Sequence, residues 1–235
     1  MTLRSWTRTP IIASAAASCL ALGAPIAAYA QAPVRTAEDL QQALQQRYES
    51  MLDLTADFTQ TYEGGVLRSS LVESGRVQLK MPGKMRWDYQ EPEHKLMVSD
   101  GEQMFMYLPD DEQVMVIAVP SDDQATTPAL ILAGIGDFVS DFTAALDTVQ
   151  DAPPDSYVLR LTPTRAEPDF EFLIVVLDSR SLTITRLMAY DLQGGISTFF
   201  FSNLQENLDL PDTPFTFEIP RGTEIISISQ STPLQ

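Results

Sequence analysis

Few side chains in this sequence are of the types that perform covalent or metal chemistry. His94 is the single histidine, so a site built from several histidines is excluded, and it stands in EPEHK, a pattern typical of an exposed turn. No G-x-S-x-G motif occurs that could supply a nucleophilic serine to pair with it. The single cysteine, Cys19, lies in an apolar N-terminal stretch, so the rest of the chain offers no thiol nucleophile and no thiolate metal ligand. We therefore predict a protein that is not an enzyme, with no catalytic residues, no metal site and no cofactor.

Charged side chains form small groups with more than one conceivable role. The carboxylates of Asp110-Asp111 and Asp122-Asp123 lie beside turn-forming residues, where calcium binding is conceivable, but no twelve-residue EF-hand loop surrounds them. Lys80, Lys84 and Arg86 flank a Pro-Gly turn, where they could pair with lipid phosphate, with a cargo protein or with a transporter. They could equally be solvated strand residues, and the sequence leaves this choice open.

The net charge of the chain argues against two classes of binding partner. The chain has 15 Lys and Arg against 32 Asp and Glu, a formal net charge of -17. Binding to nucleic acid depends on clustered basic side chains, and anionic membrane surfaces repel an acidic chain. We expect no nucleic-acid partner and no stable membrane insertion.

The first thirty residues have the pattern of a cleaved secretory signal peptide. Arg4 and Arg8 give a positive start, Ile11 to Pro25 is apolar, and the small-x-small triplet at 28–30 precedes Gln31. Residues 1–30 are therefore predicted to be removed on export. An alternative is a lipoprotein processing site at Cys19, but the apolar run continues past it, which favours a place inside the signal.

The remaining residues, 31–235, have the length of one domain with a full core. No later stretch is long and apolar enough to span a bilayer. We expect a single domain that is soluble, exported and monomeric.

Two helices have clear local signals. Thr36 has the position of an N-cap with Asp39 three residues later, and apolar residues then recur at helical spacing through Leu40, Leu44 and Tyr48. The segment TPALILAG at 127–134 has an N-cap, a proline at the first helical position, an apolar body and a terminal glycine, which predict a short helix. Apolar residues between 138 and 146 predict a further turn or two of helix.

Alternating apolar and polar residues predict ten or eleven strands, mostly in an antiparallel meander. They are expected at 54–62, 77–81, 85–89, 96–98, 103–108, 113–119, 157–161, 170–177, 182–190, 196–204 and 215–219. A single sheet of this width must curl strongly or split into two layers, and the distribution of apolar residues favours curling.

Some of these strands carry apolar residues on both faces. Side chains alternate across a strand, so Phe199 and Phe201 leave on one face and Phe200 on the other. The runs at 104–108 and 172–177 have no polar face either. We expect one face of the curled sheet to meet a structural core and the other to line a cavity that needs a lid. Which parity points inward stays open, because a shift of one residue inverts it.

The segment GRVQLKMPGKMRWDYQEPEHKLMVSDGEQMFMY, from Gly75 to Tyr107, resembles the central signature of the LolA family of periplasmic outer-membrane lipoprotein carriers. DFTQ at 57–60, TPALILAG at 127–134 and FTFEIPRG at 215–222 continue the resemblance in the family's order and spacing. The resemblance implies a mainly β fold. In that fold a single curved antiparallel sheet forms an incomplete barrel of about eleven strands, with one long N-terminal helix and short helices acting as a lid over an apolar cavity.

The resemblance also implies a function and its partners. A LolA-like protein of the periplasm receives acylated lipoproteins from an inner-membrane lipoprotein-releasing transporter. It carries them to the outer membrane, to an acceptor where one is present. Met85 and Trp87 match cavity-lining strand positions, and Leu130, Ile131 and Leu132 fall in the lid segment. With the apolar positions of the predicted strands, the expected lipid-binding set is Phe58, Val77, Leu79, Met81, Met85, Trp87, Tyr89, Met104, Met106, Leu130, Ile131, Leu132, Phe199 and Phe201.

One position departs from the family pattern. The residue before the proline that matches Pro82 is an arginine that hydrogen-bonds the lid in well-known members, and here it is Met81. Strand alternation places Lys80, Lys84 and Arg86 on the opposite face, so they are poor replacements.

Two other functions use the same expected fold. A periplasmic sensor or regulator would bind lipid or misfolded protein and relay its state to a membrane partner. A carrier of glycolipid or another lipid would share the cavity. The ligand that copurifies and the effect of deletion on lipoprotein traffic distinguish these functions.

Overall fold

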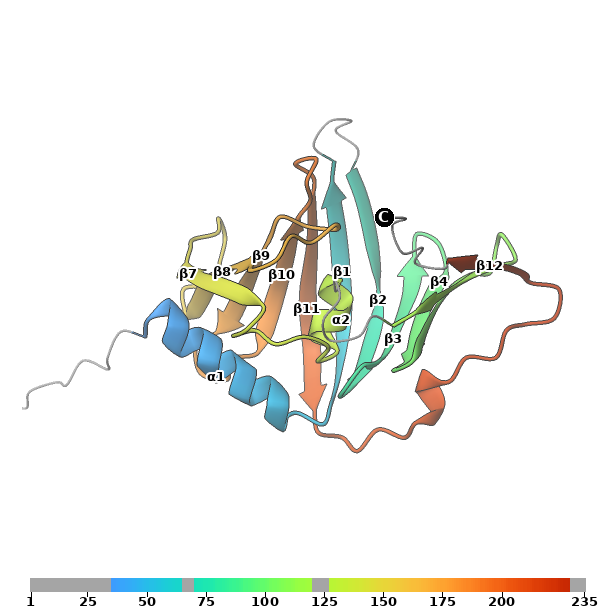
Figure 1. Cartoon of the computed structure of the whole chain (residues 1–235), viewed down its shortest axis with the longest axis horizontal. Helices are drawn as coiled ribbons and strands as arrows, with labels where there is room; N and C mark the ends of the chain where they lie inside the picture. Colours follow the sequence, from blue (N-terminus) through green and yellow to red (C-terminus); the bar gives the residue numbers. More distant parts are fainter. Residues whose placement is uncertain (1–34, 65–69, 120–126, 229–235) are drawn as a thin grey trace, which may run out of the picture. The chain divides into compact units, whose positions relative to one another are not determined.

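The computed structural model describes residues 35–64, 70–119 and 127–228. The predicted signal peptide, Cys19 and Asp122-Asp123 lie outside these residues. Twelve strands form one sheet in the order β12-β6-β5-β4-β3-β2-β1-β11-β10-β9-β8-β7 (Figure 1). The strands are β1 (Asp53–Glu63), β2 (Ser70–Lys80), β3 (Lys84–Glu91), β4 (Lys95–Asp100), β5 (Gln103–Leu108), β6 (Gln113–Ala118), β7 (Phe142–Leu146), β8 (Ser156–Pro163), β9 (Phe172–Asp178), β10 (Ile184–Tyr190), β11 (Ile196–Glu206) and β12 (Glu224–Ile228). The helices are α1 (Ala37–Ser50), α2 (Pro128–Leu132) and the 3-10 turn η1 (Thr213–Phe215).

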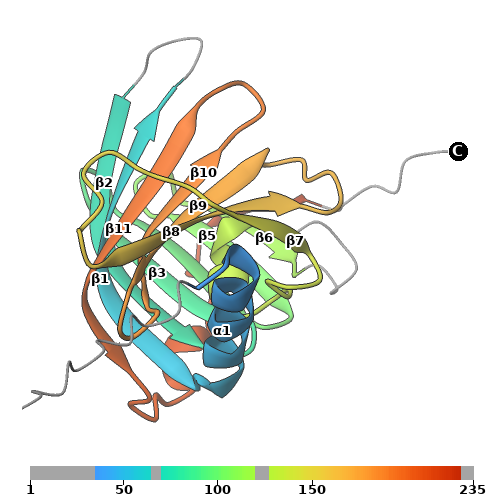
Figure 2. The same cartoon turned by 90° about the vertical axis from the view of Figure 1, so that its left-hand side faces the viewer.

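The sheet joins two antiparallel meanders and is strongly curved. Strands β1 to β6 form one meander and β7 to β11 the other, and β1 pairs with β11 to connect them. The final strand, β12, pairs with β6 in parallel. Figure 2 shows the sheet bending around the two helices. The predicted mainly β fold with one curved sheet is therefore confirmed.

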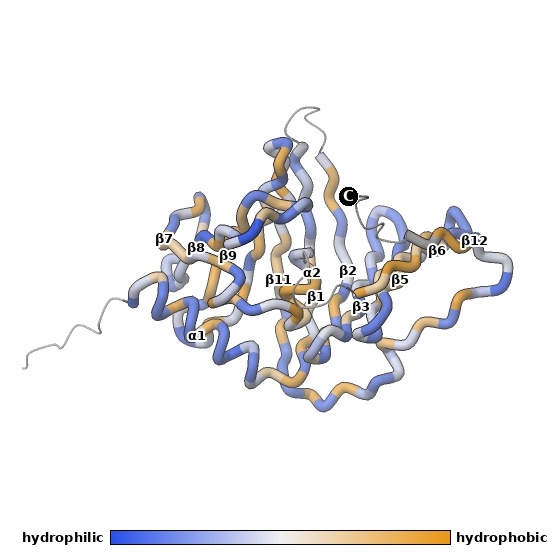
Figure 3. The backbone as a smooth tube through the Cα atoms, in the orientation of Figure 1, coloured by the Kyte–Doolittle hydropathy of each residue, from blue (hydrophilic) through white to orange (hydrophobic). Residues whose placement is uncertain are grey.

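Helix α1 begins where the sequence predicted. The Asp39 backbone N–H donates to Thr36 Oγ1, and the Asp39 carboxylate accepts from the Thr36 backbone N–H, each at 3.1 Å. This capping box satisfies two of the N–H groups that a helix start leaves free. Hydrophilic and hydrophobic residues mix along α1 (Figure 3), and its buried face carries Leu40, Leu44 and Tyr48.

Two predicted elements are wrong. The helical turns expected between 138 and 146 are instead the edge strand β7, in which Phe142 pairs with Pro163 and Leu146 with Leu159. Apolar residues at 138, 142 and 146 suit a helix, but 142, 144 and 146 suit a strand equally well. The strand expected at 215–219 is also missing from the described sheet, because Pro214 and Pro220 remove backbone donors there and the chain turns through η1. The count is twelve rather than ten or eleven because β7 and β12 were not predicted.

Parts of the sheet's outer face are covered by the chain itself. We call residues 207–223, which connect β11 to β12, the C-terminal strap. Phe215 of the strap is 1% exposed, and the ring of Phe217 lies 5.5 Å from the rings of Phe105 and Tyr107 on β5. On β9 the outward Ile174 and Val176 form a second, smaller core cluster against Val158. Strands β5 and β9, which have two apolar faces, therefore contact protein on both faces.

The strap also occupies the basic cluster at the Pro-Gly turn. Asp212 lies 2.7 Å from Lys80 Nζ and 3.1 Å from Lys84 Nζ, and these hydrogen bonds hold the pKa of the Asp212 carboxyl below its usual range. Lys80 Nζ also donates to the Leu210 carbonyl at 2.7 Å, and Arg86 donates to the Pro214 carbonyl at 3.3 Å. These cations are thus paired within the chain, which neither sequence interpretation anticipated.

Candidate functional site

The inner face of the curved sheet carries the predicted lipid-binding residues. Register fixes the parity that the sequence left open: Phe58 of β1 pairs with Phe201, and Trp87 of β3 pairs with Val77 on one side and Met97 on the other. All fourteen predicted residues belong to one hydrophobic cluster. Nine of them are buried, and the five that are partly buried are Met81, Met104, Met106, Phe199 and Phe201.

Phe200 lies on the other face. Its side chain is 39% exposed, and the Arg186 guanidinium lies 4.6 Å from its ring centre. The phenylalanine triplet thus gives two rings to the inner cluster and one to an outer cation–π contact.

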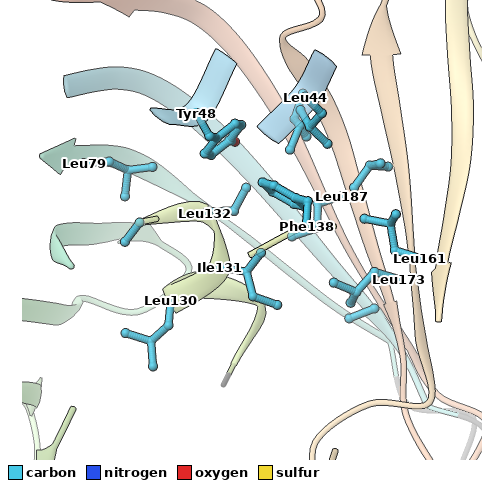
Figure 4. Packing of buried hydrophobic residues seen from close by; sticks show 14 of the residues in the cluster. Leu44, Tyr48, Leu79, Leu130, Ile131, Leu132, Phe138, Leu161, Leu173 and Leu187 are labelled. Carbon is cyan, nitrogen blue, oxygen red and sulfur yellow. The ribbon is translucent and has the colours of Figure 1, made fainter. Parts of the chain in front are cut away.

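Helix α2 lies inside the curve with its largest side chains turned to the interior. Leu130, Ile131 and Leu132 are at most 5% exposed. Pro128 opens the helix, and the Thr127 hydroxyl accepts the Leu130 backbone N–H at 3.4 Å. Figure 4 shows the three side chains of α2 surrounded by residues of α1, of the loop that follows α2 and of the strands, namely Leu44, Tyr48, Leu79, Phe138, Leu161, Leu173 and Leu187.

The space left between α2 and the sheet is small. Tyr48, Leu79 and Leu132 are among the residues around an apolar space of about 10 Å³, which is roughly the room that one water molecule needs. The side chains of α2 therefore fill the region that the sequence assigned to a cavity. A groove of about 250 Å³ opens beside it, lined by Met81 and Phe138 among others, and Tyr48 lines both spaces.

Only a short polar connection ties α2 to the sheet. The Gly83 backbone N–H donates to the Ala133 carbonyl, at the end of α2, at 2.8 Å. Within the described residues this is the one hydrogen bond between residues 128–133 and the strands or their turns. The Gly83 carbonyl in turn accepts from the buried Ser99 hydroxyl at 2.9 Å, which fixes the turn. Met81 adds an apolar contact, because a Cβ at Gly134 would lie 3.0 Å from its sulfur.

The segment that follows α2 is held by amide side chains of α1. Gln41 Nε2 donates to the Phe138 carbonyl at 2.5 Å and to the Phe142 carbonyl at 2.8 Å. Gln45 accepts the Phe138 backbone N–H at 2.8 Å. These contacts link α1 to the chain between α2 and β7.

One end of the inner face is polar. Lys95 Nζ lies 2.5 Å from Glu73 Oε1 and 4.2 Å from the ring centre of Tyr89. The Tyr89 hydroxyl donates to Gln60 Oε1, and Gln60 Nε2 donates to the Ser197 hydroxyl, each at 3.0 Å. Burial, together with the nearby Glu73 charge, raises the pKa of Tyr89, so its phenol stays protonated and can donate.

The residues that the sequence reasoning missed are polar ones. Gln41 stands one residue after Leu40 and three before Leu44 on the buried stripe of α1, and a glutamine in that stripe is a signal of a buried polar contact. The contribution of Gly83 comes from its backbone, which has no side-chain signature. Its φ of 77° does agree with the Pro-Gly turn read from the sequence.

The sequence profile described as "Outer membrane lipoprotein carrier protein LolA" matches residues 49–218. This span runs from the end of α1 through strands β1 to β11 and α2 into the strap. The chain belongs to the LolA family. The resemblance inferred from the sequence motifs is therefore confirmed.

Individual LolA relatives are similar over most of their length. An outer-membrane lipoprotein carrier protein of Chromohalobacter salexigens is 35% identical over 211 residues, covering 88% of this chain and 95% of the relative. One of Bordetella avium is 32% identical over 206 residues, covering 86% and 95%. A solved LolA superfamily protein of Nitrosomonas europaea aligns with 78% of this chain and 99% of its own, at 15% identity and a TM-score of 0.44.

LolA carriers are not enzymes, which confirms the prediction that this chain is not one. His94, the candidate for triad chemistry, is exposed in the turn between β3 and β4. Among the described residues no helix is long and apolar enough to cross a membrane.

Proposed function

We propose that this protein carries acylated lipoproteins through the periplasm, and that their acyl chains replace α2 on the inner face of the sheet. The observation that carries the proposal is a large apolar cluster on the inner face, filled by a five-residue helix that one backbone hydrogen bond among the described residues ties to the sheet. The names of the relatives, which are lipoprotein carriers, support the same cargo. Residues 1–30 would direct export and be removed.

The energetics of the cargo require such a site. Three acyl chains of about sixteen carbons would cost on the order of 35 kcal/mol if they stood fully in water. A carrier must therefore bury most of this surface, yet it must also release it. A helix that occupies the same face when cargo leaves lowers the free energy of the unloaded state and favours release. Methionines such as Met85, Met104 and Met106 adapt readily to chains in varied conformations.

The lid connection would differ from that of LolA members with an arginine before the proline. Because the Met81 side chain has no hydrogen-bond donor, the polar contact between lid and sheet is instead the hydrogen bond from the Gly83 backbone N–H to the Ala133 carbonyl. The groove lined by Met81, Phe138 and Tyr48 adjoins the filled region. We infer that α2 moves at this side when acyl chains enter.

Depletion of the protein in its native host tests the proposed function. Lipoproteins destined for the outer membrane are expected to accumulate at the inner membrane, because unassisted passage of their acyl chains through water is too costly. Fractionation and immunoblotting measure this, with re-expression of the intact chain as the control. Normal lipoprotein delivery together with altered stress signalling would support the sensor instead. Mass spectrometry of copurified ligands would identify a carrier of glycolipid or another lipid.

Partners at the two membranes follow from this route. An inner-membrane lipoprotein-releasing transporter would load the carrier, and an outer-membrane acceptor, where one exists, would unload it. We further propose that the carrier acts as a monomer.

A further inference from the structure

Trp87 lies where the inner face changes from apolar to polar. Along β3, Met85, Trp87 and Tyr89 all point inward. Met85 lies level with Leu79 of β2, in the apolar part of the cluster, while Tyr89 belongs to the network with Gln60. An amphipathic molecule that replaced α2 on this face would place its own polar boundary near Trp87.

The indole of Trp87 has a donor without an acceptor. The side chain is 1% exposed, and its Nε1 makes no hydrogen bond to any part of the chain that the structure describes. Its ring is enclosed by Phe58, Phe199 and Phe201, with centroids 5.0, 5.5 and 6.2 Å away. None of these rings offers an in-plane acceptor. A buried indole N–H usually finds a partner, so an unpaired one requires an explanation.

We propose that Trp87 Nε1 donates a hydrogen bond to the carbonyl oxygen of an ester or amide that joins an acyl chain to the cargo. The chain then extends towards Leu54 and Leu79, and the polar end of the cargo lies towards Gln60 and Tyr89. This inference rests on the proposed function and adds to it the chemical group that is recognised and the direction in which the acyl chains lie.

The group recognised follows from chemistry at this depth. A hydrocarbon chain has no acceptor and leaves the indole unpaired, whereas a carbonyl at the junction of apolar and polar regions satisfies it. A carbonyl also has lower desolvation costs than a charged phosphate, and the cation of the inner network, Lys95, is already paired with Glu73. Trp87 is therefore a specificity-determining residue for acyl esters and amides over ethers.

The test compares two probes on the purified protein, a dipalmitoyl-glyceryl cysteine peptide and its dihexadecyl ether analogue. The intact protein is expected to prefer the diester, and Trp87→Phe is expected to reduce that preference by roughly three- to tenfold, the worth of one net hydrogen bond. The ratio of the two dissociation constants is the readout, because a change in packing affects both probes alike.

Phe199→Leu is the matched control. This variant shortens an apolar side chain beside Trp87 without removing a hydrogen-bond donor. Both affinities should therefore change by the same factor, and their ratio should stay unchanged. An unchanged ratio in Trp87→Phe would overturn the inference, as would equal affinity of the intact protein for both probes. If the intact protein binds neither probe, the proposed function itself fails.

If Trp87→Phe does not fold, the contact can still be tested on the intact protein. Infrared spectra of the bound diester, with its carbonyl carbons isotopically labelled, should show one ester band shifted to the lower frequency of a hydrogen-bonded carbonyl. Bands only at the frequency of an ester in hydrocarbon would contradict the proposed contact.

Discussion

Replacing Leu130 with alanine is expected to lower the stability of the unloaded protein and to raise its affinity for acyl chains. Leu130 is fully buried in the main cluster, and such a truncation typically lowers the free energy of unfolding by about 2–5 kcal/mol. If the proposed function holds, this loss of stability affects the closed state, in which α2 occupies the inner face. A closed state that is weaker by about 2 kcal/mol relative to the open one raises the apparent affinity roughly thirtyfold. Urea unfolding and calorimetric titration with the dipalmitoyl-glyceryl cysteine peptide measure the two effects.

Ile174→Ala separates the lid effect from general destabilisation. Ile174 is 2% exposed but lies in the second cluster, on the outer side of β9. Its truncation should reduce stability to a similar extent and leave peptide affinity unchanged, because that cluster is present in both open and closed states. Equal affinities for Leu130→Ala and Ile174→Ala would make Leu130 an ordinary packing residue and argue against competition between lid and cargo.

Elements with local signals could be predicted from the sequence. Thr36 and Asp39 start α1, and Thr127 and Pro128 start α2, because caps and first-turn prolines act within a few residues. The β7 segment could not, since its apolar spacing suits both a helix and a strand and only its pairing with β8 decides. The strap is held by side chains from strands more than a hundred residues earlier, such as Lys80 with Asp212, and no local pattern encodes this.

The candidate site also has features that the sequence could predict and features that it could not. The predicted lipid-binding residues do lie in one cluster, because strand alternation and helical spacing group apolar positions on one face. Which parity points inward was decided only by the strand pairing. It did not predict that the inner face is filled. Leu130, Ile131 and Leu132 were expected to cover a cavity, and they occupy it, since an empty apolar hollow of that size loses the dispersion contacts that closure of α2 supplies. Nor did it predict the hydrogen bond between Gly83 and Ala133, which joins two backbone groups.

The second large effect is expected for Gln41→Leu, which removes the buried amide of α1. Gln41 is 6% exposed, and its Nε2 donates hydrogen bonds to the carbonyls of Phe138 and Phe142. Leucine fills a similar volume but leaves both carbonyls without this donor. Since an unsatisfied buried polar group costs about 1–3 kcal/mol, the free energy of unfolding should fall by about 2–4 kcal/mol. Urea unfolding followed by circular dichroism measures the change.

The neighbouring residue provides the control, since Gln42 lies on the exposed face of the same helix turn. Gln42→Leu should change the free energy of unfolding by no more than about 0.5 kcal/mol. Because Gln41 holds the chain between α2 and β7, its loss should also raise amide hydrogen exchange at residues 134–142 more than in β9, whose strand pairing does not involve α1. Equal losses of stability in the two variants, or exchange that rises uniformly, would show that α1 merely packs on the sheet. A local rise would instead identify α1 as the element that restrains the lid segment, so that α1 and α2 act together.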